Sequence, residues 1–501
     1  PHPPQSPSRN APVSFYPILT IVDRQTQKLL VGFGGIVVAS LLVGIVGDWW
    51  FLAGVPALAL LIYLAIVDFK KVFFFLLFLL PLSTEVWLPN GVVTDLPTEP
   101  LTVLMMGIYF LYVLRQGKAL SAGFLRHPIT LLLLAHLGWM FFTAITSQAF
   151  VVSGKFFLAK VWYVTTFYFL AGSLLKTEKD FRTLLWCVFI PLFFIILYVL
   201  YGHSKLGFSF ADVNHPVHPF FRNKVAYACM MTLFLPFVWF GRKFYRRFSW
   251  RWWWLLAGVG VFLVGIQFSY TRAAYVMLAM AIGAGIAIHF KLMKPVLLVS
   301  AVVAVFGIAN LLQENAYLNM KPNYDKTITH DRFDDLLSAT TEGRDVSTME
   351  RVYRWVAGMQ MIEDKPLLGF GPGTFTAFYK TYTVHGFRTY VSENTEGSGI
   401  HSYYLMTFVE QGFIGGLIFV ALVFFVLLKG EQIYHETTDP TRRRIVMTVL
   451  LCIVVIDGLL LMNDLLETDK AGTFFFLCMA VLVNMDLKNK REKQADGDES
   501  I

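Results

Sequence analysis

Long apolar segments, separated by short polar ones, recur along most of the chain. Many reach roughly 20 residues, the length at which an α-helix crosses about 30 Å of hydrocarbon. We therefore expect an all-α polytopic membrane protein with about 14 (12–14) transmembrane helices. The predicted spans cover residues 29–47, 49–67, 72–83, 100–114, 128–146, 157–174, 183–201, 224–240, 252–269, 273–290, 295–311, 412–428, 444–461 and 471–486.

The composition agrees with a membrane protein. The chain is 56% hydrophobic and 15% charged, with a mean hydropathy of +0.58, whereas soluble domains carry about 25% charged residues. The net charge of +8 follows the membrane pattern, so it does not indicate a nucleic-acid partner. The cysteines all lie in apolar segments, which gives no reason to expect a disulfide framework. They are Cys187, Cys229, Cys452 and Cys478.

Basic residues are concentrated in alternate connections between the predicted spans. "DFKK" (68–71) and "GRKFYRRFSWR" (241–251) are examples, whereas the connection 83–100 carries acidic residues and no Lys or Arg. Basic connections are typically cytoplasmic, which places both termini in the cytoplasm. The N-terminal tail, 1–28, is polar and Pro-rich and lacks the apolar core of a signal peptide.

One connection is much longer than the others. Residues 312–411 form an extracytoplasmic loop in this topology, and connections of this length usually carry function. Residues 347–375 predict an amphipathic helix that begins with a capping box of Ser347 and Glu350 and ends at "GFGPG". The predicted parts of the chain are a tail (1–28), spans 1–11 (29–311), the loop (312–411), spans 12–14 (412–486) and a second tail (487–501).

Basic side chains at the membrane boundaries are candidates for binding an anion. Arg222 precedes one span, Arg272 lies in a short turn between two spans, and Lys160 lies within a third. A charge at such depth is costly and usually faces a partner inside the protein. The planar fork of donors on arginine suits a diphosphate. The alternative is that these side chains snorkel to lipid headgroups.

The large loop adds a pair of arginines and a histidine. Arg351 and Arg354 lie about one helical turn apart, where they can hold an anion together or simply be exposed on the helix surface. His401 lies directly before a predicted span in "GIHSYYLMTFVEQGFIGG" (399–416). With an ordinary pKa near 6.5 it can act as a general base, and a packing role is the alternative.

A metal site is not predicted. Asp212, His215 and His218 in "ADVNHPVH" are interrupted by proline and lack a further strong ligand. We therefore expect neither a metal nor another cofactor.

Three segments, in this order, resemble the bacterial O-antigen ligase and polymerase superfamily. They are "SYTRAAYVMLAMAIG" (269–283), "RVYRWVAGMQMIEDKPLLGFGPGTF" (351–375) and "IHSYYLMTFVEQGFIGGLIFV" (400–420). Ligases of this superfamily share a pattern that begins with a His followed by Asn, Ser or Gln. Nine residues later comes a Gly, and after two more residues a Gly, Thr or Tyr. The residues that match this pattern are His401, Ser402, Gly412 and Gly415. The ligase branch is therefore the preferred hypothesis.

The resemblance implies a metal-independent, inverting glycosyltransferase of the bacterial inner membrane, with a periplasmic active site. Its donor would be a glycan on undecaprenyl diphosphate, and its acceptor a sugar hydroxyl of lipid A–core. Arg222 and Arg272 would stabilise the leaving diphosphate, with Arg351 and Lys160 as further candidates. His401 would remove the acceptor proton.

Three other functions remain open from the sequence. A polymerase of the same superfamily would join repeat units carried on two lipids, and a protein O-oligosaccharyltransferase would glycosylate a peptide. A transporter of lipid-linked glycans is a third alternative, but transporters tend to contain internal repeats, and we find none here.

Overall fold

The computed structural model describes residues 24–47, 52, 54–87, 93–116, 120–313, 346–387, 392–394 and 397–498. The chain divides into two compact units, Pro1–Val72 and Phe73–Ile501. The first unit contains α1 (Arg24–Val46) and α2 (Val55–Val67), both apolar helices. Because α1 begins at Arg24, the end of the predicted tail 1–28 is helical, and the rest of that tail lies outside the described residues.

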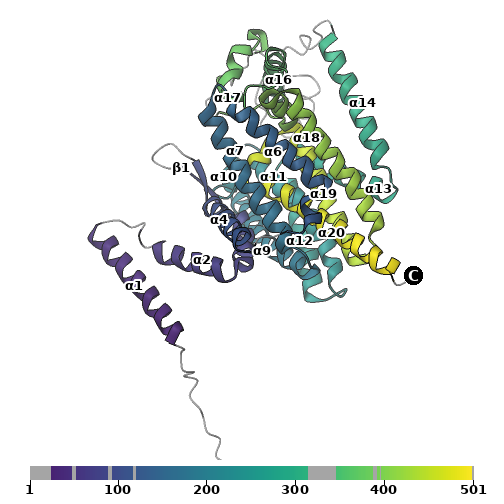
Figure 1. The fold of residues 1–501 in the computed structure, drawn as a ribbon. Coiled ribbons are helices and arrows are strands. Elements are labelled where there is room, and N and C mark those ends of the chain that lie inside the picture. The colour runs from purple at the N-terminus through teal and green to yellow at the C-terminus, as the bar shows by residue number, and fades with distance from the viewer. Residues whose placement is uncertain are drawn as a thin grey trace, which may run out of the picture. The chain divides into compact units, whose positions relative to one another are not determined.

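The second unit is a bundle of apolar helices (Figure 1). Ten helices among the described residues are long and apolar enough to cross a membrane. They are α6 (Pro128–Ile145), α7 (Phe150–Val164, continued by η3, Thr165–Leu170, and α8, Ala171–Leu174), α9 (Glu178–Ser204), α11 (Lys224–Gly241), α12 (Trp250–Phe268), α13 (Arg272–His289), α14 (Met293–Leu312), α18 (Tyr403–Glu436), α19 (Pro440–Met462) and α20 (Asp469–Asp498).

Two further helices, α3 (Phe69–Leu79) and α4 (Thr98–Gln116), coincide with the remaining predicted spans of the bundle. The prediction of an all-α, multi-pass membrane protein is confirmed. The number of fourteen spans stays a prediction. The apolar segments of α1 and α2, Val31–Val46 and Val55–Val67, are shorter than the ten helices above, and α3 and α4 are not among those ten.

The centre of the bundle is formed by α19 and α20, which are buried over most of their length. α19 packs against α11, α13 and α18, and α20 packs against α18 and α19. The helices around them expose Leu, Val, Ile and Phe side chains. An exposed apolar surface on a helix bundle is what a lipid environment requires. α14 is the extreme case, with almost all of its large side chains exposed.

Short elements lie in two connections outside the bundle, the one that precedes α4 and the large loop that precedes α18. A hairpin of β1 (Thr84–Trp87) and β2 (Val93–Leu96) pairs Thr84 with Leu96, and it was not predicted from the sequence. The large loop contains α16 (Val346–Asp364), α17 (Phe375–Phe378) and two 3-10 turns (Tyr379–Tyr382 and His385–Phe387).

The helix predicted within the large loop is present as α16, but its predicted start is wrong. α16 begins at Val346, before Ser347, so Ser347 is not the residue that precedes the helix. The Glu350 side chain faces Arg354 and Ser392 instead of the helix start. These contacts are long-range or depend on burial, which a local capping pattern does not include.

Candidate active site at one end of the bundle

The polar residues singled out from the sequence lie at one end of the bundle, which we call the site end. α11, α13, α18 and α20 begin there and α19 ends there, and α16 packs on α18 (Figure 1). The backbone N–H of Tyr403 donates to the Asn463 carbonyl at 3.1 Å. This bond joins the start of α18 to the connection between α19 and α20, so residues far apart in the chain meet here.

His401 is held just outside the first turn of α18. Ser402 caps that helix, because its hydroxyl accepts from the backbone N–H of Leu405, and this fixes the chain on which His401 lies. The φ of His401 is 59°, in the left-handed region that residues other than Gly rarely adopt. Backbone strain of this kind tends to persist where function requires it.

The His401 ring meets a buried arginine from α16. Arg354 Nη1 lies 2.8 Å from His401 Nε2 and also donates to the Gly399 carbonyl at 3.0 Å. Arg354 Nη2 lies 3.5 Å from a Glu350 carboxylate oxygen, and the other oxygen of Glu350 accepts from the Ser392 hydroxyl. Arg354 is therefore a buried part of the site and not a surface residue of the loop helix.

These surroundings keep the imidazole neutral. Burial, followed by the positive charges of Arg354 and Arg351, lowers the pKa of His401 to about 4, against a smaller opposing effect of Asn463. Its Nδ1 atom is buried, and no described group, the nearby Asn463 side chain included, meets it with normal hydrogen-bond geometry. A neutral ring with one unengaged nitrogen is suited to contact a substrate at neutral pH.

Asp464 brings an acidic group to the same place. A Cβ atom on Gly399 would lie 1.8 Å from Asp464 Oδ2, so the carboxylate fits there because residue 399 is glycine. Burial raises the pKa of Asp464, and the charge of Glu467 adds to the rise, while Arg354 and Arg222 oppose it. A carboxyl group with a raised pKa is suited to accept a proton in catalysis.

Arg222 links the residues around His401 and Asp464 to the starts of α11 and α13. It is exposed, close enough to Asp464 to affect its charge, and forms no hydrogen bond or ion pair with the described residues. The next residue, Asn223, caps α11 by accepting from two backbone N–H groups. Arg272 is the first residue of α13, and the positive charges of Arg272 and Lys224 repel each other.

The starts of α11 and α13 are also in direct contact. The Thr271 hydroxyl donates to the Lys224 carbonyl at 3.4 Å. Arg222, Lys224 and Arg272 therefore form a basic cluster where two membrane helices begin. The positive ends of both helix dipoles add to this charge, which favours an anion.

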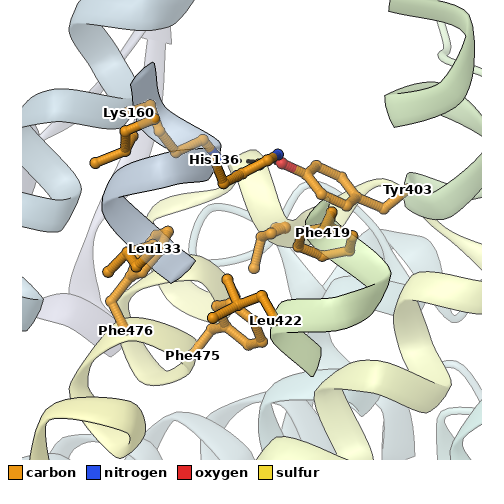
Figure 2. Close-up of a pocket in the computed structure, with 10 residues that line it drawn as sticks. Leu133, His136, Lys160, Tyr403, Phe419, Leu422, Phe475 and Phe476 are labelled. Carbon is orange, nitrogen blue, oxygen red and sulfur yellow. Dashed lines mark hydrogen bonds between the residues drawn. The ribbon is translucent and has the colours of Figure 1, made fainter. Parts of the chain in front are cut away.

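Lys160 occupies a more buried position on α7. Its Nζ donates to Glu467 Oε1 at 2.5 Å and to the Tyr403 hydroxyl at 3.3 Å. Lys160 is 3% exposed, so the Glu467 charge offsets the cost of burying it. Figure 2 shows Lys160, His136 and Tyr403 together at a cavity of about 10 Å³, room for roughly one water molecule.

A kink in α18 seats the large loop on the bundle. Gly412 adopts φ 67° and ψ −175° inside this helix, and a Cβ atom there would lie 2.1 Å from the Leu367 carbonyl oxygen. The buried Glu410 carboxylate accepts from the backbone N–H groups of Gly373 and Phe375, at 2.8 and 3.0 Å. The "GFGPG" turn is thereby fixed to α18, and α16 with it.

The structure thus brings the predicted residues together to different degrees. His401, Arg351 and Arg354 form one cluster, and Arg222 is linked to it through Asp464. Arg272 lies in the basic cluster, whereas Lys160 is already paired. Among the described residues, no group of His, Cys, Asp or Glu is arranged to hold a metal ion, Asp212, His215 and His218 included.

Asp464 and Glu467 belong to the site but were not predicted from the sequence, and Arg354 was predicted without its buried role. A signal for the first two was present: "NDLLETDK" (463–470) is a short connection rich in acidic residues on the predicted extracytoplasmic side. Nothing in the local pattern distinguishes Arg354 from Arg351.

A helix bundle of this kind, with a buried basic and acidic site at one end, defines a multi-pass membrane protein with an enzyme-like centre. Residues 257–420 match the family model described as O-antigen ligase. This match, over less than half of the chain, supports the O-antigen ligase superfamily, whose family proteins are glycosyltransferase-like enzymes of O-antigen processing. No curated protein matches the chain.

Proposed function

We propose that this protein is an O-antigen ligase. It transfers a glycan from undecaprenyl diphosphate to a sugar hydroxyl of lipid A–core. The observation that carries the proposal is the meeting of two groups at one end of a membrane bundle. One is the basic cluster at the starts of α11 and α13, and the other is His401 with Asp464, which both interact with Arg354 and which we call the His401–Asp464 pair. The first group suits a diphosphate and the second suits a hydroxyl acceptor.

The basic cluster is the site for the donor. Breaking the glycosidic bond leaves the undecaprenyl diphosphate with increased negative charge. Arg222 and Arg272 carry permanent positive charge at the ends of membrane helices, where fixed donors stabilise developing charge better than water does. Arg351 is a further donor-binding candidate from the loop side. Lys160 is already paired with Glu467, so it affects the donor only indirectly, through the charge of that ion pair.

The acceptor occupies the side of His401 and Asp464. The acceptor oxygen forms a bond to the anomeric carbon while the bond from that carbon to the diphosphate oxygen breaks. The electron pair leaves with the diphosphate, the anomeric configuration inverts, and the acceptor proton passes to a group of the His401–Asp464 pair. Because both substrates are lipids, the reacting groups meet at the membrane surface.

The proposed location follows from the charge pattern. Basic connections such as 241–251 lie at the end of the bundle opposite the site end. By the positive-inside rule that end is cytoplasmic, so the site end is periplasmic in the inner membrane. A periplasmic site is where a lipid-linked donor replaces a nucleotide sugar.

The test is a deletion of the native gene, complemented with the wild type, His401→Ala or His215→Ala. His215 is exposed on α10 (Asn214–Val217) and serves as the matched histidine control. Surface glycolipid is resolved by gel, and the lipid-linked pool is measured by mass spectrometry. We expect His401→Ala to accumulate long glycan on undecaprenyl diphosphate and to leave lipid A–core bare.

Two other results would contradict the proposal. Accumulation of single repeat units on the carrier would indicate a polymerase. Normal surface glycolipid in the His401→Ala strain would assign His401 to packing.

A further inference from the structure

The nitrogen that would make His401 a base is already engaged. A guanidinium group has donors and no acceptor, so in the contact between Arg354 Nη1 and His401 Nε2 the arginine donates and the imidazole accepts. A neutral imidazole carries one proton and one lone pair. With the lone pair on Nε2 taken, the proton lies on Nδ1, which points to a buried position without a hydrogen-bond partner among the described residues.

We propose that Arg354 is a positioning residue that holds His401 as the Nδ1–H tautomer, so that His401 acts on the acceptor as a hydrogen-bond donor and not as the general base. This inference rests on the proposed function and assigns the role of His401 within it. Asp464 is then the group of the pair that takes the acceptor proton. His401 orients the acceptor by donating from Nδ1 to an oxygen of the sugar.

Arg354 is itself held in place. It is 4% exposed, and its donors engage the Gly399 carbonyl and the Glu350 carboxylate as well as His401. Ser392 donates to the second oxygen of Glu350, which fixes that carboxylate. A guanidinium with three fixed partners has little freedom to swing away and release His401 Nε2.

The backbone next to His401 packs closely against α16, the helix that carries Arg354. The indole N–H of Trp355 donates to the Ile400 carbonyl at 3.1 Å. A Cβ atom on Gly358 would lie 2.5 Å from the end of the Ile400 side chain, so α16 and residue 400 approach closely. These contacts make α16 the element that sets the orientation of the His401 ring.

The charges that face His401 come from two sides. From α16, Arg351 and Arg354 act on the ring, and Glu350 pairs with Arg354. From the connection between α19 and α20, Asp464 interacts with Arg354 and so reaches the ring only through that arginine. The arginines disfavour protonation of the ring, and burial acts in the same direction. The neutral donor form is therefore maintained across the physiological pH range.

The first experiment replaces His401 with each of the two amide residues, Asn and Gln. The amide nitrogen of Asn overlies Nδ1 of His, whereas that of Gln overlies Nε2, and neither amide is a base at neutral pH. Transfer from a glycan-loaded undecaprenyl diphosphate to lipid A–core is measured with the full-length protein in proteoliposomes. We expect His401→Asn to keep kcat within about tenfold of the wild type, and His401→Ala and His401→Gln to lose at least about 100-fold.

The second experiment tests Arg354 through pH. In Arg354→Met, His401 Nε2 loses its donor, so the neutral ring can carry its proton on either nitrogen, and the pKa of His401 should rise toward its ordinary value near 6.5. Activity at pH 7.5 should therefore fall by about tenfold, and the loss should be smaller at pH 5.5, where the protonated ring again carries a proton on Nδ1. Arg354→Lys retains a charged donor and should keep the wild-type profile. This recovery on acidification should vanish in Arg354→Met/His401→Asn, which separates it from titration of Asp464. Lys380→Met, at an exposed position of the same loop, is the matched control.

A third readout does not depend on activity. Nitrogen-15 histidine spectra of the wild type, minus those of His401→Ala, report the tautomer of His401 directly, and we expect a protonated Nδ1. An unprotonated Nδ1 in that spectrum, or a His401→Asn variant as inactive as His401→Ala, would overturn the inference. An inactive wild type with a protonated Nδ1 would instead contradict the proposed function alone.

Discussion

Two histidines, one at each end of the bundle, have opposite surroundings. At the end away from the site, His127 Nε2 lies 3.1 Å from Asp486 Oδ2, and its Nδ1 accepts from the backbone N–H of Ile129 at 3.2 Å. Lys429 and Lys490 also pair with Asp486. At the site end, His401 faces a cation instead of an anion, and one of its nitrogens has no hydrogen bond within the described residues.

The difference separates a structural histidine from a functional one. Both nitrogens of His127 are used by the fold, so it has nothing left for a ligand. His401 is partly buried, with a buried and unengaged Nδ1 atom and a left-handed backbone. Each of these features costs stability, and proteins tend to retain such costs at functional sites. The residue type is the same in the two cases, although His127 is the more buried of the two, and the partners make the distinction.

The largest expected effect tests this comparison directly. His401→Ala should lower transfer activity by at least about 100-fold, because a group that contacts the acceptor is lost. His127→Ala should leave turnover per folded molecule within about twofold and should instead destabilise the fold by about 1–3 kcal/mol, because a partner of the buried Asp486 is removed. Transfer assays in proteoliposomes and thermal unfolding in detergent check the two parts. Equal losses of activity in both variants would abolish the distinction.

The next effect concerns the ion pair within the site end. Lys160→Met leaves Glu467 without its charged partner, and breaking a buried pair on one side should destabilise the protein by about 3 kcal/mol. Lys160→Met/Glu467→Gln should recover most of this loss, because the uncompensated charge is gone. Thermal unfolding of the two single variants and the double variant gives the coupling. Additive losses would mean that the two side chains do not stabilise each other.

A smaller effect is expected from the backbone of α18. Gly412→Ala should cost about 1–3 kcal/mol, because φ 67° with ψ −175° is a region open almost only to glycine and the methyl group would meet the Leu367 carbonyl. Gly283→Ala, in the regular helix α13 with open space around it, is the matched control and should be neutral or slightly stabilising. The two variants are compared by thermal unfolding in detergent. A neutral Gly412→Ala would show that the kink is not needed to seat the loop.

Much of the fold could be predicted from the sequence, because membrane helices are recognisable by the length and apolar composition of their segments. Each predicted span of the bundle coincides with a helix, and the helix of the large loop is present as α16. The hairpin of β1 and β2 was missed, because two short strands make a weak pattern beside apolar helices.

The site was predicted in part. His401 and the arginines stood out because charges beside membrane spans are rare and costly. Asp464 and the role of Arg354 could not be found in that way, since both depend on segments that meet only in the folded chain. A glycine at residue 399 makes room for a carboxylate 65 positions further along, and no local pattern encodes that contact.

The smallest expected effect is a pH dependence of stability that His401 should contribute. The folded protein holds the pKa of His401 at about 4, below its ordinary value near 6.5 in the unfolded chain. Between these values the unfolded chain binds more protons, so this histidine makes stability rise with pH and fall on acidification. From pH 7 to pH 6 the expected loss is about 0.7 kcal/mol.

Asp464 acts with the opposite sign, because its pKa is raised in the folded protein and protonation then favours the folded state. Subtracting the stability curve of His401→Asn from that of the wild type removes the contribution of Asp464 and leaves that of His401. A difference curve that is flat between pH 7 and 5 would mean that the ring is as easily protonated in the folded protein as in the unfolded chain. In that case Arg354 would not be acting on His401, and the contrast with His127 would rest on geometry alone.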